Sequence, residues 1–228
     1  MKELHSEIAN RYSLGEQVRN HILKKIATGE LSPGDRIVEA RISNELKVSS
    51  IPVREAIREL VAIQVLEYIV HKGARVREVS MSETVDALHV KAVLEALAVR
   101  LADKKLKRRI PELQMYLKLI LESALRHDYT EYQKQNQLFH RTIVEASGNQ
   151  ILIRLWDSLA FMVRTRSIMD YLHIVDAYEV AKEHENILHA AESEHTEELA
   201  SLLMSHANRL VEHLENQMAV YKKDVTDS

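Results

Sequence analysis

The sequence contains very few residues of the kind that end helices. Its 228 residues include only 5 glycines and 3 prolines, and these two residue types mark most turns and loops. Hydrophobic residues make up 46% of the chain and charged residues 29%, which is typical of a folded globular protein. The composition therefore predicts a mainly α-helical fold with long helices and few loops.

Two kinds of pattern divide the chain near Ser80. Before it, apolar spacing predicts short helices at 14–28, at 39–48 and from Ser49 onward, then two short strands at 68–70 and 74–79 around a turn with Gly73. After it, the whole sequence has helical spacing. Helices are predicted near 83–105, 110–127, 130–147, 149–170, 174–193 and 195–222. We therefore predict two domains, 1–79 and 80–228, of which the second is an all-α antiparallel helical bundle.

Three helices followed by a β-hairpin are the layout of a winged helix-turn-helix. The helix that begins near Ser49 would enter the major groove of DNA by its N-terminal end. Residues 1–78 carry a net charge of +2 and the remainder −5. This asymmetry is expected of a basic DNA-binding domain joined to an acidic helical domain. Winged helices also mediate protein contacts, so the layout alone leaves that alternative open. The candidate DNA-contacting residues are Arg41, Lys47, Ser49, Ser50, Arg54, Arg58, Lys72, Gly73 and Arg75.

The segments LSPGDRIVE and VSSIPVREAIRELVAIQVLEYIVHKGARVREVS resemble the DNA-binding domain of bacterial GntR-family transcription regulators. The match includes the run Pro52 to Ala56 and the wing Gly73–Arg77, and it covers about 65 residues. The resemblance implies a sequence-specific DNA-binding regulator. The chain departs from the family pattern at Lys47, Ser50 and Ile51, where the family has Gly, Arg and Thr. Base edges are read at the last two positions, so the family's usual operator is not expected here.

Three histidines lie on the apolar faces of three separate predicted helices: His140, His184 and His206. One such histidine alone is usually a hydrogen-bonded core residue. Inward groups of a narrow helical bundle can converge, however, and neutral imidazole is the commonest ligand for zinc, nickel, copper or iron. Asn136 lies one helical turn before His140 and could add a carbonyl oxygen. A metal site and a set of core histidines both remain open on this evidence.

The helical half is similar to the FCD-type effector domain of the FadR subfamily of GntR regulators. That resemblance implies a divalent metal, zinc or nickel, held by Asn136, His140, His184 and His206. The family has an Asp where this chain has Asn136, which predicts weaker metal binding. It also implies a small carboxylate effector bound at the metal with the help of basic residues. The candidates for this contact are Lys91, Arg164 and Arg166.

Catalysis is not expected, although three histidines around a metal also describe hydrolase sites. The segment HENILH places His184 and His189 five residues apart, whereas zinc proteases need a spacing of four, so that both imidazoles share a helix face. Glu185 would face solvent, so no general base is apparent. A metal-responsive regulator without an organic effector is the main alternative, and a metal-dependent hydrolase a remote one.

The expected function is a regulator, more often a repressor than an activator, that binds double-stranded operator DNA as a homodimer and responds to a small organic acid. The chain has no cysteine, which excludes disulfides and thiolate metal sites. The N-terminus MKELHSEIANRY lacks the apolar core of a signal peptide, and no stretch is apolar enough for a membrane span. A cytoplasmic location is therefore expected.

Overall fold

The computed structural model describes residues 13–159, 172–173 and 175–226, which form two compact units, Met1–Glu78 and Val79–Ser228. The first contains α2 (Leu14–Ala27), α3 (Glu39–Leu46), α4 (Ser50–Ala62), β1 (Leu66–Ile69) and β2 (Gly73–Val76). The second contains α5 (Met81–Ala102), the 3-10 helix η1 (Asp103–Arg109), α6 (Ile110–Leu125), α7 (Tyr129–Ala146), α8 (Gln150–Ser158), α10 (Ala177–Glu192) and α11 (Thr196–Thr226).

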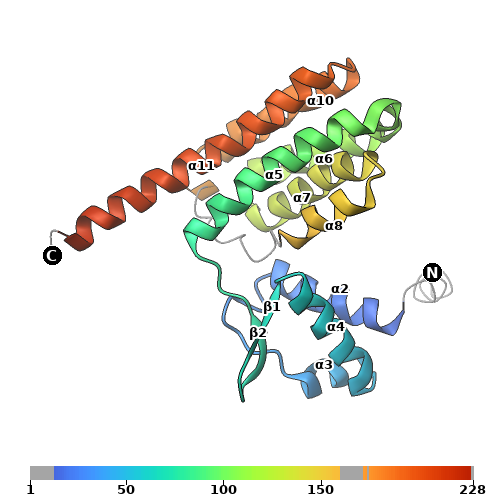
Figure 1. The fold of residues 1–228 in the computed structure, drawn as a ribbon, viewed down its shortest axis with the longest axis vertical. Coiled ribbons are helices and arrows are strands. Elements are labelled where there is room, and N and C mark those ends of the chain that lie inside the picture. Colours follow the sequence, from blue (N-terminus) through green and yellow to red (C-terminus); the bar gives the residue numbers. More distant parts are fainter. Residues whose placement is uncertain (1–12, 160–171, 174, 227–228) are drawn as a thin grey trace. The chain divides into compact units, whose positions relative to one another are not determined.

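The first unit is the winged helix-turn-helix that the sequence predicts (Figure 1). α2 begins with a capping box, in which the Ser13 hydroxyl accepts from the Glu16 backbone N–H and the Glu16 carboxylate accepts from the Ser13 N–H. α2 packs against α4, and fully buried side chains such as Val18, Ile22 and Ile57 form the core of the unit. Burial of these apolar faces fixes the position of α4, the predicted DNA-contacting helix, against α2.

The hairpin differs slightly from its prediction. β1 and β2 pair antiparallel with Ile69 opposite Gly73, so Gly73 opens the second strand instead of lying in the turn. An isolated bridge between Arg36 and Arg75 adds a third short segment beside β2. The wing is thus anchored on both sides of Arg75.

Lys47 adopts a left-handed backbone conformation, with φ of 55°, at the turn between α3 and α4. Glycine adopts this conformation without steric cost, which explains why the family pattern places glycine there. Ser49 occupies the N-cap position of α4, but its side chain makes no capping hydrogen bond. The Ser49 hydroxyl therefore remains at the surface.

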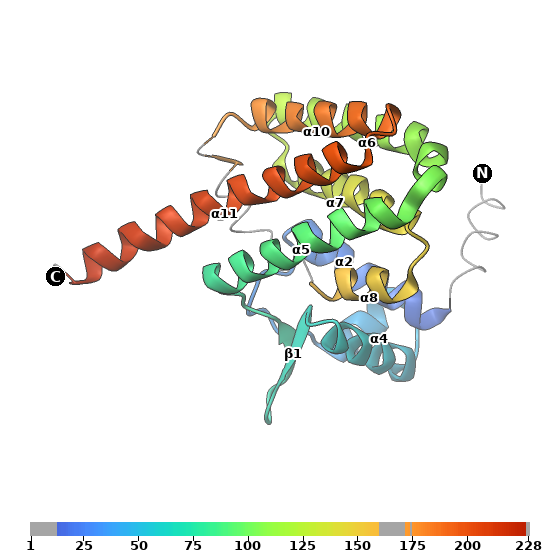
Figure 2. The same ribbon diagram turned by 45° about the horizontal axis from the view of Figure 1, so that its top comes forward.

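The second unit is a bundle of helices, in which α5 packs against both α7 and α11, and α6 packs against both α7 and α10 (Figures 1 and 2). The fold class is therefore confirmed: a mainly α protein with one small β-hairpin. The α-helix predicted to reach residue 105 ends at Ala102 and continues as a 3-10 helix, and the predicted helix 149–170 is described only to Ser158.

The N-terminus of α7 has one of the two hydrogen bonds of a capping box. The Asp128 carboxylate accepts a hydrogen bond from the Glu131 backbone N–H, but the Glu131 carboxylate binds Lys134 and Gln135 instead of returning to Asp128. The single capping bond is sufficient to begin α7 at Tyr129 and so fixes the phase of the helix that carries His140. Within the described residues, no helix is long and apolar enough to span a membrane.

Candidate functional site

The three predicted histidines converge in the second unit. His140 lies on α7, His184 on α10 and His206 on α11, and one ring nitrogen from each lies within 4.8 Å of the others. Their ring centroids are separated by 4.6 to 5.5 Å. His140 and His184 are fully buried, whereas the His206 side chain is 13% exposed, so the cluster is closed on one side and approaches the surface at α11.

Each of these histidines has its Nδ1 atom engaged by an oxygen. Nδ1 of His140 lies 3.1 Å from Glu95 Oε2, Nδ1 of His184 lies 3.1 Å from the Ala181 carbonyl oxygen, and Nδ1 of His206 lies 2.7 Å from Glu183 Oε2. Because carbonyl and ionised carboxylate oxygens only accept, we assign the proton of each neutral ring to Nδ1. This tautomer leaves a lone pair on every Nε2.

The Nε2 atoms are placed to receive a cation. Nε2 of His140 is buried and has no hydrogen-bond partner among the described residues. Nε2 of His184 lies 2.7 Å from the side-chain amide of Asn136 on α7. With the ring proton on Nδ1, this contact is a hydrogen bond only when the Asn136 amide is turned so that its N–H donates to Nε2. Histidines whose other ring nitrogen donates to a carboxylate or carbonyl are the usual arrangement around protein metals. The residues present therefore fit a divalent transition metal.

The protonation equilibria agree with ligation by neutral imidazoles. Burial lowers the pKa of His140, and the negative charge of Glu95 only partly opposes this effect. Burial, reinforced by the neighbouring imidazoles, lowers the pKa of His184 and His206 well below the ordinary value. Neutral rings at physiological pH keep their lone pairs available.

Glu95 on α5 is the buried carboxylate behind this cluster. It accepts hydrogen bonds from Lys91 Nζ at 2.8 Å and from Trp156 Nε1 at 2.9 Å, in addition to His140. Burial alone raises the pKa of Glu95, but His140 and Lys91 together lower it more, so that it lies well below its usual range. The carboxylate is therefore ionised, with its oxygens occupied, and it orients His140 without facing the centre.

Sequence reasoning did not assign a role to Glu95, Trp156 or Glu183. A signal for Glu95 exists, because it interrupts the apolar run LEALAV at a position of helical spacing that is otherwise buried. Glu183 gives no such signal, since an acid beside a histidine on a helix is most often a solvated side chain. Its Oε1 also pairs with Arg209 Nη1 at 2.6 Å, which holds the carboxylate against His206.

The predicted effector-contacting residues have different outcomes. Lys91 is buried, pairs with Glu95, and lies 3.3 Å from Nδ1 of His140, on the edge of the ring away from Nε2. Its role as an effector clamp stays a prediction. Arg164 and Arg166 lie outside the described residues.

The candidate DNA-contacting residues lie at the surface of the first unit, around α3, the start of α4 and the hairpin. Arg54 pairs with Glu39 at 2.8 Å, Arg41 with Glu45 at 2.9 Å, and Arg75 with Glu67 at 2.7 Å. The remaining candidates are exposed: Lys47, Ser49, Ser50, Arg58, Lys72 and Gly73.

Arg36 is a further exposed cation beside the wing, and it is not among the predicted DNA-contacting residues. A Cβ placed on Gly73 would lie 3.8 Å from the Arg36 guanidinium. The alternation of Arg36, Ile37 and Val38 is the signal that predicts an extended segment there.

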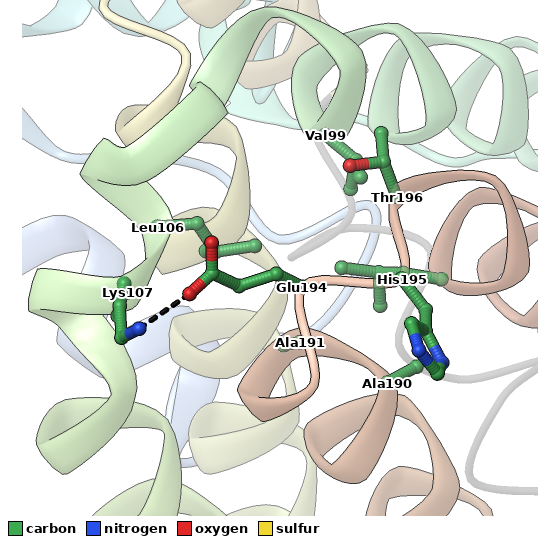
Figure 3. Close-up of a pocket in the computed structure, with 9 residues that line it drawn as sticks. Val99, Leu106, Lys107, Ala190, Ala191, Glu194, His195 and Thr196 are labelled. Atoms are coloured by element: carbon green, nitrogen blue, oxygen red, sulfur yellow. Dashed lines mark hydrogen bonds and ion pairs between the residues drawn. The ribbon is translucent and has the colours of Figure 1, made fainter.

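A separate pocket of about 150 Å³ lies at the junction of α5, η1 and the α10–α11 turn (Figure 3). Its apolar floor includes Val99 and Leu199, and the ion pair of Lys107 with Glu194 lies at its edge. None of the clustered histidines lines it. It is therefore distinct from the candidate metal centre.

A winged helix-turn-helix followed by an all-helical domain is an architecture of bacterial transcription regulators. Residues 14–76 match the model of the bacterial regulatory proteins of the gntR family, and residues 86–209 match the FCD domain. The chain belongs to the GntR family, in the FadR-type group that carries an FCD domain. It is a transcription regulator and not an enzyme.

Similar proteins include a probable D-xylose utilization operon transcriptional repressor of Paenarthrobacter nicotinovorans, which is 34% identical over 160 residues, covering 70% of this chain and 71% of the relative. The transcriptional regulator McbR of Escherichia coli is 29% identical over 162 residues, covering 71% and 72%. The structure of E. coli McbR/YncC has the same fold, with a TM-score of 0.77 at 24% identity, covering 91% of this chain and 99% of that one.

Proposed function

We propose that this regulator represses transcription from a two-fold symmetric operator, and that a small carboxylate bound at a metal in the second unit controls its affinity for DNA. The observation that carries the proposal is the convergence of three imidazoles on α7, α10 and α11, each with Nδ1 engaged by an oxygen and with one ring nitrogen of each within 4.8 Å of the others. A core histidine explains one such ring, but not three that converge.

In this proposal a zinc or nickel ion is held by Nε2 of His140, His184 and His206, with Asn136 as a fourth, weaker donor. A bound ion of this kind supplies a Lewis-acid centre that binds the carboxylate effector. Glu95 and Glu183 act by orienting His140 and His206, and the backbone carbonyl of Ala181 does the same for His184. Because the three rings belong to different helices, loading of the site would change how α7, α10 and α11 pack.

DNA contact is assigned to the exposed cations and hydroxyls of the first unit. The N-terminal turn of α4, with Ser49, Ser50 and Arg54, would face the major groove, and Lys72 with Arg75 would reach the flanking backbone or minor groove. Arg54 and Arg41 are paired with surface carboxylates, and phosphates would replace these partners on binding. A regulator bound to chromosomal DNA acts in the cytoplasm of a bacterial cell.

A second copy of this chain is the proposed partner of the outer face of α5. Val90, Val93, Leu97 and Leu101 are between 42% and 59% exposed and follow one another at helical spacing, on the face opposite the core of the unit. Asp86 and Arg100 flank Val93 at seven residues on either side. Antiparallel pairing of two α5 helices about Val93 would therefore place each Asp86 near the partner's Arg100, as an isologous interface requires.

The dimer is tested by Leu97→Glu, which places a charge in the apolar face. Sedimentation analysis should show a dimer for the wild-type chain and a monomer for the variant. Leu125→Glu on α6 is the matched control, because Leu125 is also an exposed leucine, 62% accessible, outside this face. A dimer that survives Leu97→Glu would contradict the assigned interface.

The effector proposal is tested by operator affinity. The DNA site would be selected from random sequence by the protein itself, and binding measured by fluorescence anisotropy with Ni²⁺ or Zn²⁺ alone and with a panel of small organic acids. We expect the release of DNA only when metal and acid are both present, and no response in His184→Ala. A response to metal alone would favour the metal-responsive alternative, and an unchanged response in His184→Ala would contradict both.

A further inference from the structure

Ile51 is a large apolar side chain on the surface of the first unit. It is the second residue of α4 and is 67% exposed. The buried residues of this helix, among them Val53, Ala56 and Leu60, lie on the opposite face at helical spacing. Ile51 therefore points away from the core, and its apolar character is not explained by the packing of the unit.

The exposed residues around Ile51 are polar. From Ser49 to Glu59, every other exposed residue carries a hydroxyl group or a charge. The Ser49 hydroxyl makes no capping hydrogen bond, and the Arg54 guanidinium, one helical turn after Ile51, is 60% exposed. Protein-binding surfaces are usually marked by a contiguous apolar patch, whereas hydroxyls and guanidinium groups suit phosphates and base edges. The start of α4 therefore fits DNA better than it fits a protein partner.

The major groove of DNA presents one apolar group, the C5-methyl of thymine, among hydrogen-bond donors and acceptors. A helix that enters this groove by its N-terminal end turns its first residues toward the base edges. Isoleucine has no hydrogen-bonding group in its side chain, so contact with a methyl group is the favourable interaction open to Ile51 there. Its β-branched side chain also has few rotamers, so little conformational entropy is lost when a base fixes it.

We infer that Ile51 selects thymine at one position of each operator half-site by packing against the C5-methyl group of that base. The inference rests on the proposed contact of α4 with DNA and deepens it, because it names the chemical group that one residue recognises. Removal of one buried methyl group corresponds to about a fourfold change in affinity. Ile51 therefore adds selectivity between bases, while the cations of the unit supply attraction to any DNA sequence.

The test replaces each thymine of the selected operator, one at a time, by deoxyuridine, which lacks only the C5-methyl group. Fluorescence anisotropy would measure the affinity of the full-length protein for each DNA. We expect one thymine in each half-site at which the replacement weakens binding about fourfold, and no loss at that position in Ile51→Ser. Ile151→Ser is the matched control and should keep the wild-type response, because Ile151 is also the second residue of its helix, α8, and is 64% exposed.

The outcomes separate the inference from the proposal beneath it. Full affinity of the wild-type chain for every deoxyuridine operator would overturn the inference and leave the contact of α4 with DNA standing. An equal loss in the wild type and in Ile51→Ser would also overturn it, because another residue or the shape of the DNA would then recognise the thymine. A repeated operator selection with Ile51→Ser should no longer prefer thymine at that position, and a retained preference would contradict the inference. Failure of the wild-type chain to select any operator would remove the proposed DNA contact and the inference together.

Discussion

Glu45 in the first unit and Glu95 in the second are both carboxylates held by a histidine and a lysine. Glu45 binds His21 at 2.8 Å and Lys25 at 3.0 Å, and also Arg41, a candidate DNA contact. The Glu45 side chain is 27% exposed, whereas that of Glu95 has no exposed surface. The two carboxylates therefore have the same kinds of partner in different surroundings. At the surface, the cations that bind Glu45 could exchange it for DNA phosphates, whereas the partners of Glu95 in the core could not. The first arrangement suits the proposed contact with DNA, and the second suits the proposed metal site.

The largest effect on stability is expected from Glu95→Gln. The amide cannot balance the charge of Lys91, and removing one partner of a buried ion pair costs about 3–5 kcal/mol. Chemical unfolding followed by the fluorescence of Trp156, which donates to Glu95, would measure the loss. The double variant Lys91→Met/Glu95→Gln removes both charges and should recover much of it. Wild-type stability of Glu95→Gln alone would show that the buried pair contributes little.

Arg54→Ala should weaken DNA binding without destabilising the chain. Its guanidinium is 60% exposed and bound only to a surface carboxylate in the described structure, so its loss leaves no buried group unpaired. A base or phosphate contact of an arginine is worth about 1–3 kcal/mol, or roughly 5- to 150-fold in operator affinity. Fluorescence anisotropy titrations on the selected operator would measure the change in affinity. An unaltered affinity for the operator would show that α4 is not the helix that contacts the bases.

Glu45→Gln should destabilise the first unit by a smaller amount. Hydrogen bonds from His21 and then Lys25 lower the pKa of Glu45 to about 2. A carboxylate whose pKa is lowered by folding stabilises the protein above its ordinary pKa, and this contribution is lost as the pH falls from about 4.5 toward 2. We expect a loss of about 1–2 kcal/mol at neutral pH, and a difference from wild type that shrinks in acid. An acid titration of unfolding would measure this, and a difference independent of pH would contradict it.

The smallest effect is expected from Lys47→Gly, and it should be stabilising. Lys47 has a φ of 55°, and the strain of a side chain in that conformation is about 1 kcal/mol. The flexibility of glycine in the unfolded chain offsets part of this gain. The melting temperature should therefore rise by only about one to a few degrees. A lower melting temperature would mean that the Lys47 side chain makes stabilising contacts in the turn.

The sequence predicts the helices well because their apolar spacing is regular and their boundaries coincide with caps such as Ser80 and Asp128. It places His140, His184 and His206 on inward faces for the same reason. It misses η1, because helical spacing does not distinguish an α-helix from a 3-10 continuation. The register of the hairpin is also missed, because strand pairing depends on contacts between segments.

The hydrogen bonds that orient the histidines likewise cannot be predicted from local sequence patterns. Glu95 and Trp156 are 61 residues apart in sequence and meet only because α8 packs against α5. The pairing of Glu183 with His206 depends on the relative rotation of α10 and α11. Periodicity fixes which face of a helix is buried, whereas the partner across the interface is fixed by three-dimensional packing.

The central claim is that His140, His184 and His206 form one metal site, and metal stoichiometry tests it most directly. Equilibrium dialysis against Ni²⁺ with acetate, followed by mass-spectrometric quantification, would be applied to the wild-type chain, to His184→Ala and to His189→Ala. His189 is the matched control, because it lies on the same helix but is exposed. We predict one Ni²⁺ per chain for the wild type and His189→Ala, and almost none for His184→Ala. Equal metal content in all three would contradict the account.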